Sequence, residues 1–149
     1  MKKVIAEKNK KCILETIITI LLMIVLISIC VINAIKNIHG ISMEIVYIGL
    51  SIILLYWVYK ETLTLKMQIN LPNELITVEN NQLYIYSDKE ITLNIEDVIS
   101  IEKDVVIKKL LANEASLQVK TNDTTYKVIY IKDIDKVVEE LSSIIKVGD

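Results

Sequence analysis

The chain of 149 residues has no arginine and no phenylalanine, and it contains one proline, three glycines, two cysteines and one histidine. So little proline and glycine excludes a collagen-like, linker-like or disordered chain. Residues 60–149 carry eleven lysines against sixteen acidic residues. Without arginine and with this acidic balance, the chain lacks the concentrated basic face that phosphate groups require. The sequence therefore predicts no nucleic-acid partner.

The residue types that carry catalysis or bind metals are also scarce. Cys12 and Cys30 lie at or inside an apolar run, and their separation of 18 residues fits no metal site. His39 has no second histidine or cysteine near it, although a metal site needs several ligands. Residues 60–149 contain neither residue type, and no glycine-rich phosphate loop occurs. We predict no catalytic, cofactor-binding or metal-binding residue, no cofactor and no enzymatic activity.

The most prominent positive feature is a long apolar segment. Residues 12–59 include three charged side chains, whereas residues 60–149 include 27. Two uncharged runs within the segment have 20 and 15 residues. The first matches the roughly 20 residues that cross a bilayer, and the second is short. The pattern predicts a two-helix transmembrane hairpin over 12–59, with helices at about 13–35 and 41–59.

Aromatic and basic residues predict where this hairpin meets water. The second run closes with Tyr56, Trp57, Tyr59 and Lys60, which are typical of a membrane interface. Residues 1–11 have a net charge of +4, and the loop between the runs has one lysine. By the positive-inside rule, this basic N-terminus and the C-terminal region both lie in the cytoplasm. The isoleucine, lysine and asparagine bias is typical of an AT-rich bacterial genome, so we expect a multi-pass protein of the bacterial cell membrane.

A lipoprotein signal that ends at Cys30 is the alternative for the first apolar run. Ile29 is bulkier than the small residue that normally precedes a lipidated cysteine, and Glu15 interrupts the start of the run. A second apolar run also follows. The transmembrane hairpin is therefore the preferred interpretation.

Residues 60–149 have the patterns of a small mainly-β domain. Apolar residues alternate from Thr62 to Leu71, which predicts a strand or an extended lead-in within a linker over 60–74. Short apolar runs then alternate with asparagine-rich and aspartate-rich turns, and the longest run has room for a bulge. Two of these turns, Asn80-Asn81 and Asn122-Asp123, predict hairpins. These runs predict strands at Ile76–Glu79, Leu83–Ser87, Ile91–Asn94, Val98–Ile107, Ala115–Thr121 and Thr124–Ile131.

The last segment changes to a helical period. Apolar residues recur at intervals of three and four from Ile134 to Ile145, and Asp133 stands at the N-cap position. This predicts an amphipathic helix of about three turns. Its apolar stripe is expected to cover the sheet that precedes it.

This order of elements resembles the bacterial pleckstrin-homology-like domains found on small membrane proteins. The resemblance is carried by LITVENNQLYIYS, by ITLNIEDVISIEKD and by SLQVKTNDTTYKVIYIKDIDKVVEELSSII. It implies a membrane α-hairpin followed by a mainly-β (α+β) domain over 75–149, with six or seven antiparallel strands capped by a C-terminal helix. Some small proteins of this kind are similar to immunity proteins that protect bacteria making leaderless bacteriocins.

A ligand surface is predicted where lysines gather near one end of the sheet. The five lysines of this basic edge are Lys103, Lys108, Lys109, Lys120 and Lys127. The strongest cluster is the contiguous segment from Lys108 and Lys109 to Leu110 and Leu111, because two charges beside two apolar residues suit a lipid interface or another ligand. A solvated strand end is the alternative, since the domain is acidic and has no arginine.

Together these features predict a membrane-anchored, non-enzymatic interaction module that gives self-immunity against a membrane-active bacteriocin peptide. The immunity role comes from the resemblance alone. The alternative is a scaffold or accessory subunit of a larger membrane complex such as an exporter, because a short second span is easier to place beside other helices. The expected partners are the bilayer and either a bacteriocin peptide or a membrane protein, and self-association stays open.

Overall fold

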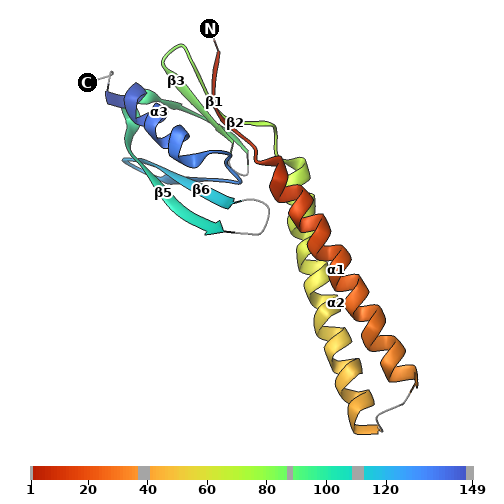
Figure 1. The fold of residues 1–149 in the computed structure, drawn as a ribbon. Coiled ribbons are helices and arrows are strands. Elements are labelled where there is room, and N and C mark those ends of the chain that lie inside the picture. The colour runs from red at the N-terminus through yellow and green to blue at the C-terminus, as the bar shows by residue number, and fades with distance from the viewer. Residues whose placement is uncertain (1, 37–40, 87–88, 109–112, 147–149) are drawn as a thin grey trace. The chain divides into compact units, whose positions relative to one another are not determined.

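The structure is a computed structural model that describes residues 2–36, 41–86, 89–108 and 113–146. Its elements follow one another as β1 (Lys3–Glu7), α1 (Lys10–Lys36), α2 (Ile41–Asn70), β2 (Glu74–Glu79), β3 (Gln82–Tyr86), β4 (Glu90–Asn94), the 3-10 helix η1 (Ile95–Asp97), β5 (Val98–Lys108), β6 (Asn113–Thr121), β7 (Thr125–Ile129) and α3 (Ile134–Lys146) (Figure 1). They form two compact units. We call Met1–Cys12 with Asn70–Asp149 the β domain, and Ile13–Ile69 the helical hairpin.

The first eleven residues are part of the β domain, which corrects the expectation of a separate basic tail over 1–11. β1 pairs antiparallel with β2, and Ala6 is the partner of Ile76. Ile5 and Ala6 are buried in the core. Burial of these side chains stabilises a strand whose flanking lysines can stay in water. The domain therefore consists of two chain segments separated by the hairpin, and the predicted domain over 75–149 lies within the larger one, Asn70–Asp149.

The segment expected to be a linker over 60–74 is mostly helical. α2 continues to Asn70, so the strand or extended segment expected from Thr62 to Leu71 is wrong. Within the helix Leu65 is half-buried, whereas Leu63 and Met67 are exposed. Extending an existing helix avoids the cost of nucleation, so a helix that has begun in the apolar run can continue into this polar segment. Only residues 71–73 then separate α2 from β2.

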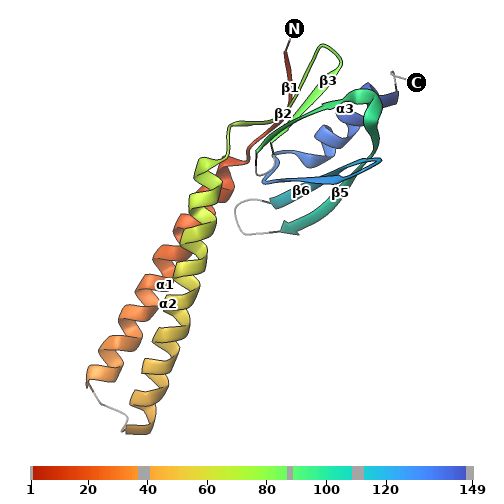
Figure 2. The ribbon, with the colours of Figure 1, turned by 180° about the vertical axis from the view of Figure 1, so that it is seen from behind.

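The hairpin packs through a seam with a period of three and four residues. Figures 1 and 2 show α1 and α2 lying side by side in antiparallel directions. The least exposed positions of α2 are Glu44, Tyr47, Ser51, Leu54, Val58, Glu61, Thr64, Leu65 and Gln68. This is close to the heptad spacing of helices that pack along a shared seam. On α1 the most buried positions of the hairpin are Thr16, Cys30 and Ala34, and small residues allow helices to approach closely.

The β domain contains two antiparallel sheets in the described residues. The first has the order β1-β2-β3-β4 and the second the order β5-β6-β7. The predicted turn at Asn80-Asn81 is confirmed, because these residues have φ of 51° and 63°, as a two-residue hairpin turn requires. The bulge predicted in the long strand is also confirmed by register shifts along β5. The seven strands match the expected six or seven only because β1 replaces the strand expected before Pro72.

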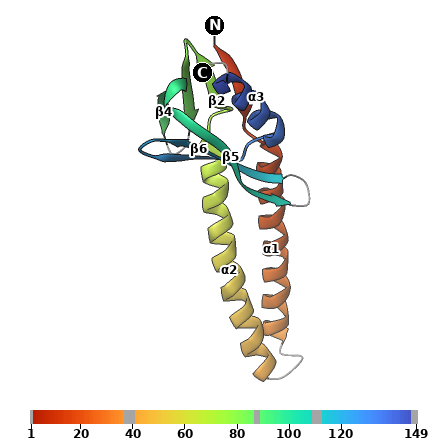
Figure 3. The same cartoon turned by 90° about the vertical axis from the view of Figure 1, so that its left-hand side faces the viewer.

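The core of the β domain lies between the sheets and α3. α3 packs against β1, β5 and β6 (Figure 3), which confirms the expected role of the amphipathic C-terminal helix. Val137 and Leu141 of α3 are buried in the same core as Leu83, Leu117 and other strand residues. Cys12 also belongs to this core, whereas Cys30 lies in the hairpin seam, and both cysteines are free thiols.

Candidate interaction site

The predicted interface residues lie on the outer surface of α2. Tyr56, Trp57 and Tyr59 are each more than half exposed. Lys60 Nζ lies 5.8 Å from the centroid of the Tyr56 ring, within the range of a cation–π contact. The helix does not end there, because it continues for ten more residues to Asn70. These residues therefore form a belt within the helix rather than at its end.

The predicted ligand cluster cannot be placed as a unit. Lys108 is the last residue of β5. Lys109, Leu110 and Leu111 lie outside the described residues. The cluster stays a prediction from the sequence.

The rest of the predicted basic edge is neutralised by carboxylates. Lys120 Nζ lies 2.8 Å from Glu102 Oε2. Lys103 pairs with Asp135, and Lys127 pairs with Asp104. A lysine that already holds a carboxylate has less charge to offer to a phosphate. These three lysines therefore form a mixed-charge sheet surface rather than a basic edge.

Asp104 is the centre of a polar network on the second sheet. Its Oδ1 accepts a hydrogen bond from Gln118 Nε2 at 2.9 Å, and its Oδ2 accepts one from Ser116 Oγ at 3.1 Å. The hydrogen bond from Lys127 lowers the pKa of Asp104, and the bonds from Ser116 and Gln118 act in the same direction. Glu102 follows the same rule, since its hydrogen bond with Lys120 lowers its pKa. Both carboxylates are thereby held in the charged form.

The segment that links β1 to α1 is held by hydrogen bonds within the β domain. Residues 7–9 make backbone hydrogen bonds to Asn73 on one side and to Tyr130 and Lys132 on the other, with lengths between 2.7 and 3.0 Å. Tyr130 has a φ of 60°, which is rare for a bulky residue and marks local strain. The hydrogen bond from Lys8 to Asn73 joins the segment after β1 to the segment after α2.

Lys8 is a buried lysine within this segment. Its side chain is 8% exposed, and its ammonium group donates a hydrogen bond to the carbonyl of Leu71, the residue after α2. Burial lowers the pKa of Lys8, and the nearby charge of Lys10 lowers it further. Composition and spacing gave no sign of this residue, because the sequence shows it only as one of five lysines in a basic stretch.

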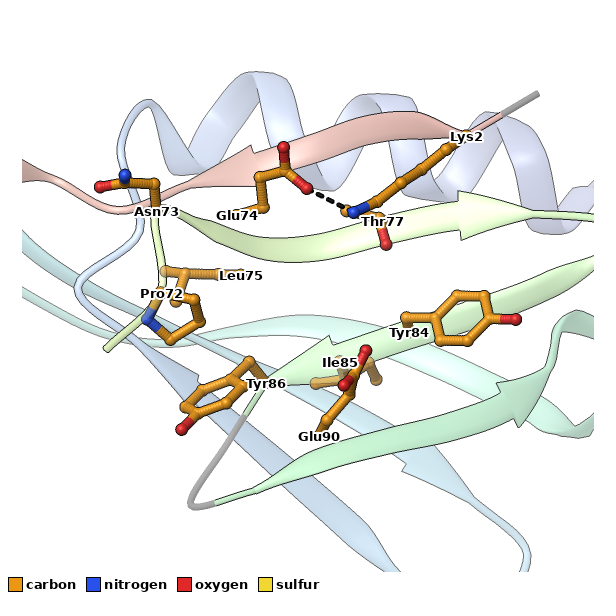
Figure 4. A pocket seen from close by; sticks show the side chains of 10 residues that line it. All are labelled: Lys2, Pro72, Asn73, Glu74, Leu75, Thr77, Tyr84, Ile85, Tyr86 and Glu90. Atoms are coloured by element: carbon orange, nitrogen blue, oxygen red, sulfur yellow. Dashed lines mark hydrogen bonds and ion pairs between the residues drawn. The ribbon is translucent and has the colours of Figure 1, made fainter. Parts of the chain in front are cut away.

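A pocket of about 410 Å³ opens on the first sheet, and Figure 4 labels the ten residues that line it. They come from β2, β3, β4 and the segment before β2, together with Lys2, which directly precedes β1. Tyr84 and Tyr86 are half-buried, while their neighbours Leu83 and Ile85 on the same strand are buried in the core. By the alternation of a strand, the two tyrosines lie on the opposite side of β3 from Leu83 and Ile85, and Tyr86 also packs against the core.

Charged side chains flank this pocket on two sides. Lys2 Nζ lies 2.6 Å from Glu74 Oε2, and this ion pair forms one side. Glu90 of β4 forms the other, beside its cross-strand partner Tyr86. Figure 4 shows the Glu90 side chain extending from β4 over β3. Sequence reasoning missed this site because Lys2 is far along the chain from the other lining residues, which lie between Pro72 and Glu90.

Among the residues that the structure describes, no group of three or more histidine, cysteine, aspartate and glutamate side chains is placed to hold a metal ion. His39 lies outside those residues. No protein-family model, no curated protein and no solved structure matches the chain. The function is therefore inferred from the sequence and the geometry.

Proposed function

We propose that the chain is a membrane-anchored, non-enzymatic interaction module of the pleckstrin-homology-like class that protects a bacterial cell against a membrane-active peptide. The observation that carries the anchor is the inverted burial of the helical hairpin. Its large apolar side chains are mostly exposed, while Thr16, Ser51 and Gln68 are buried between the helices. A helix pair is built in this way when hydrocarbon rather than water surrounds it.

The dimensions of both helices fit this anchor. α1 and α2 have 27 and 30 residues and are long and apolar enough to cross a membrane. Polar side chains along them bond to their own helices. Ser28 Oγ donates to the Ile24 carbonyl at 2.9 Å, and Ser51 Oγ donates to the Tyr47 carbonyl at 2.8 Å. Such bonds lower the cost of placing hydroxyl groups in hydrocarbon.

The connectivity favours one orientation in which both ends of the hairpin lie on the same side. The chain leaves the β domain after Cys12 and returns to it at Asn70, and β1 pairs with β2. Two crossings return the chain to the side on which it began. The N-terminal segment has a net charge of +4. Since positive segments stay inside, we place the β domain in the cytoplasm of a bacterial cell, at its membrane.

The order of elements in the β domain supports the proposed class. A four-stranded and a three-stranded antiparallel sheet are followed by a helix that packs on the core. This is the mainly-β architecture with a C-terminal helix that the resemblance implies. The hairpin between β1 and β2 is then an insertion after the first strand rather than a preceding segment.

Protection is the first candidate role, and it rests on the resemblance to immunity proteins. The scaffold role depends on a second span that is too short to cross the bilayer unaided. The structure weakens this reason, because α2 has 30 residues and Glu61 and Gln68 continue the seam of the helix pair beyond the apolar run.

A tolerance assay tests the protective role. The chain is expressed in a sensitive Gram-positive host, which is challenged with a panel of small cationic bacteriocins and, as a control, with an unrelated membrane stress. We expect survival to rise for one peptide of the panel only. The variant Ala6→Asp buries a charge in the β domain and leaves the sequence of the hairpin unchanged. It should not protect the cells, which controls for protection by the hairpin alone. Unchanged survival with every peptide would reject protection and leave the scaffold role, to be sought by pull-down in mild detergent.

A further inference from the structure

We propose that the pocket lined by Lys2, Glu74, Tyr84, Tyr86 and Glu90 binds a lysine or arginine side chain of a cationic peptide in extended conformation. The inference names a site and a partner class for the proposed interaction module, and it rests on that proposal.

The charge of the pocket is negative. Two carboxylates, Glu74 and Glu90, line it together with one ammonium group, Lys2. Glu74 is paired with Lys2, whereas the Glu90 side chain makes no hydrogen bond or ion pair with the described residues. A carboxylate at the mouth of a pocket attracts a cation and repels phosphate or another anion.

Lys2 is itself an ammonium group that the carboxylates near this pocket stabilise. Its hydrogen bond with Glu74 raises the pKa of its ammonium group, and the charges of Glu74, Glu79 and Glu90 act in the same direction. The charges of these three carboxylates, of which Glu74 and Glu90 line the pocket, therefore favour a lysine ammonium group at the position of Lys2 Nζ. A lysine from another chain would meet the same field, beside Lys2 at Glu90 or in place of Lys2 at Glu74.

The aromatic side chains suit the rest of such a ligand. Tyr84 and Tyr86 are half-buried on this face, and Pro72 adds an apolar surface (Figure 4). Aromatic faces attract ammonium and guanidinium groups and also contact the aliphatic stem of the side chain. The volume of about 410 Å³ exceeds what one lysine side chain fills and leaves room for adjoining backbone.

The edge of the sheet favours a peptide over a free amine. β4 ends the strand order of the first sheet and pairs with β3 alone among the described strands. Glu90 is the first residue of β4. An extended segment that pairs with a sheet edge places alternate side chains on one face, so it can direct a lysine to Glu90 while its backbone bonds to β4.

Binding can be measured with the full chain in a neutral detergent and a fluorescently labelled oligolysine peptide, by anisotropy. Glu90→Gln removes one pocket charge, and Glu96→Gln removes the same charge from the exposed helix η1 as a matched control. We expect Glu90→Gln to weaken binding about threefold more than Glu96→Gln does. Lys2→Met frees Glu74 and should tighten binding about threefold. Added salt should weaken binding.

Equal weakening by Glu90→Gln and Glu96→Gln would overturn the inference, because it would show a diffuse charge effect. Weaker binding by Lys2→Met, or no binding by the unaltered chain, would do the same. Displacement of the peptide by spermine at equal charge concentration would assign the site to polyamines and reject the peptide. Binding without protection in the tolerance assay rejects the proposed function and keeps the site, whereas protection that survives Glu90→Gln and Lys2→Met unchanged rejects the site.

Discussion

The helical hairpin and the β domain place apolar and polar side chains in opposite ways. In the hairpin Leu21, Leu22 and Val25 are exposed, and Thr16 Oγ1 donates to Gln68 Oε1 at 3.2 Å between the helices. In the β domain strand residues such as Ile76, Leu83 and Leu117 are buried, and ion pairs such as Lys120–Glu102 lie outside. One chain of 149 residues thus follows two packing rules.

The difference shows what holds each region together. In the β domain the removal of apolar surface from water is the main stabilising effect. The hairpin buries so little of its apolar surface that this effect cannot hold its helices together. Close contact at small residues such as Cys30 and Ala34, with a few interhelical hydrogen bonds, remains available. The two regions should therefore respond differently to the same kind of substitution.

The largest loss of stability is expected in β1, the N-terminal strand that pairs with β2. Ala6→Asp places an unpaired carboxylate at a fully buried position opposite Ile76, which should cost about 4 kcal/mol of domain stability. Amide hydrogen exchange of β2 and β6 in the detergent-solubilised chain measures it. Val4→Asp, at an exposed position of the same strand, is the control and should cost much less. Equal, small effects of both variants would restore the basic-tail interpretation.

A smaller effect separates the two packing rules directly. Leu83 is 2% exposed and Leu22 is 61% exposed. Leu83→Ala should destabilise the β domain by about 3 kcal/mol, since it leaves a cavity. Leu22→Ala should change the stability of the hairpin by less than about 0.5 kcal/mol, because it leaves none. Exchange rates of β3 and α1 report the two effects, and a large loss in α1 would show that Leu22 is covered by another chain or copy.

Local patterns allowed the prediction of elements whose signals lie within a few residues. The Asn80-Asn81 turn, the bulged β5 and the helix α3 each depend on short-range periodicity or on residues that tolerate a positive φ. The second predicted turn, at Asn122-Asp123, joins β6 and β7 as expected but without positive φ at either residue. A pattern can thus predict a connection without its conformation.

Features that depend on distant partners could not be predicted. β1 is a five-residue strand whose partner β2 comes after the whole hairpin, and its charged flanks outweigh its apolar centre in any composition count. The segment from Thr62 to Leu71 fits both a period of two and the seam period that passes through Leu65 and Gln68. The helix that begins in the apolar run continues through this segment, and packing beside α1 selects the seam period. The pocket likewise depends on Lys2 meeting Glu74, 72 residues away.

The smallest effect expected is a response to acid that distinguishes the surface of the β domain. The partners of Glu102 and Asp104 lower the pKa values of both carboxylates in the folded chain. Their contribution to stability is present above the unfolded pKa of about 4 and is lost as the pH falls through the lower folded values.

Asp104→Asn should therefore reduce the acid-induced loss of stability, measured as the midpoint of thermal unfolding between neutral pH and about pH 3. Asp123→Asn, in the exposed turn between β6 and β7, is the matched control and should leave the acid response close to that of the unaltered chain. The Thr16–Gln68 hydrogen bond between the helices holds no ionisable group, so it adds nothing to this response. An acid response identical in all three chains would mean that the Asp104 network does not stabilise the β domain, and the contrast between the two regions would then rest on their cores alone.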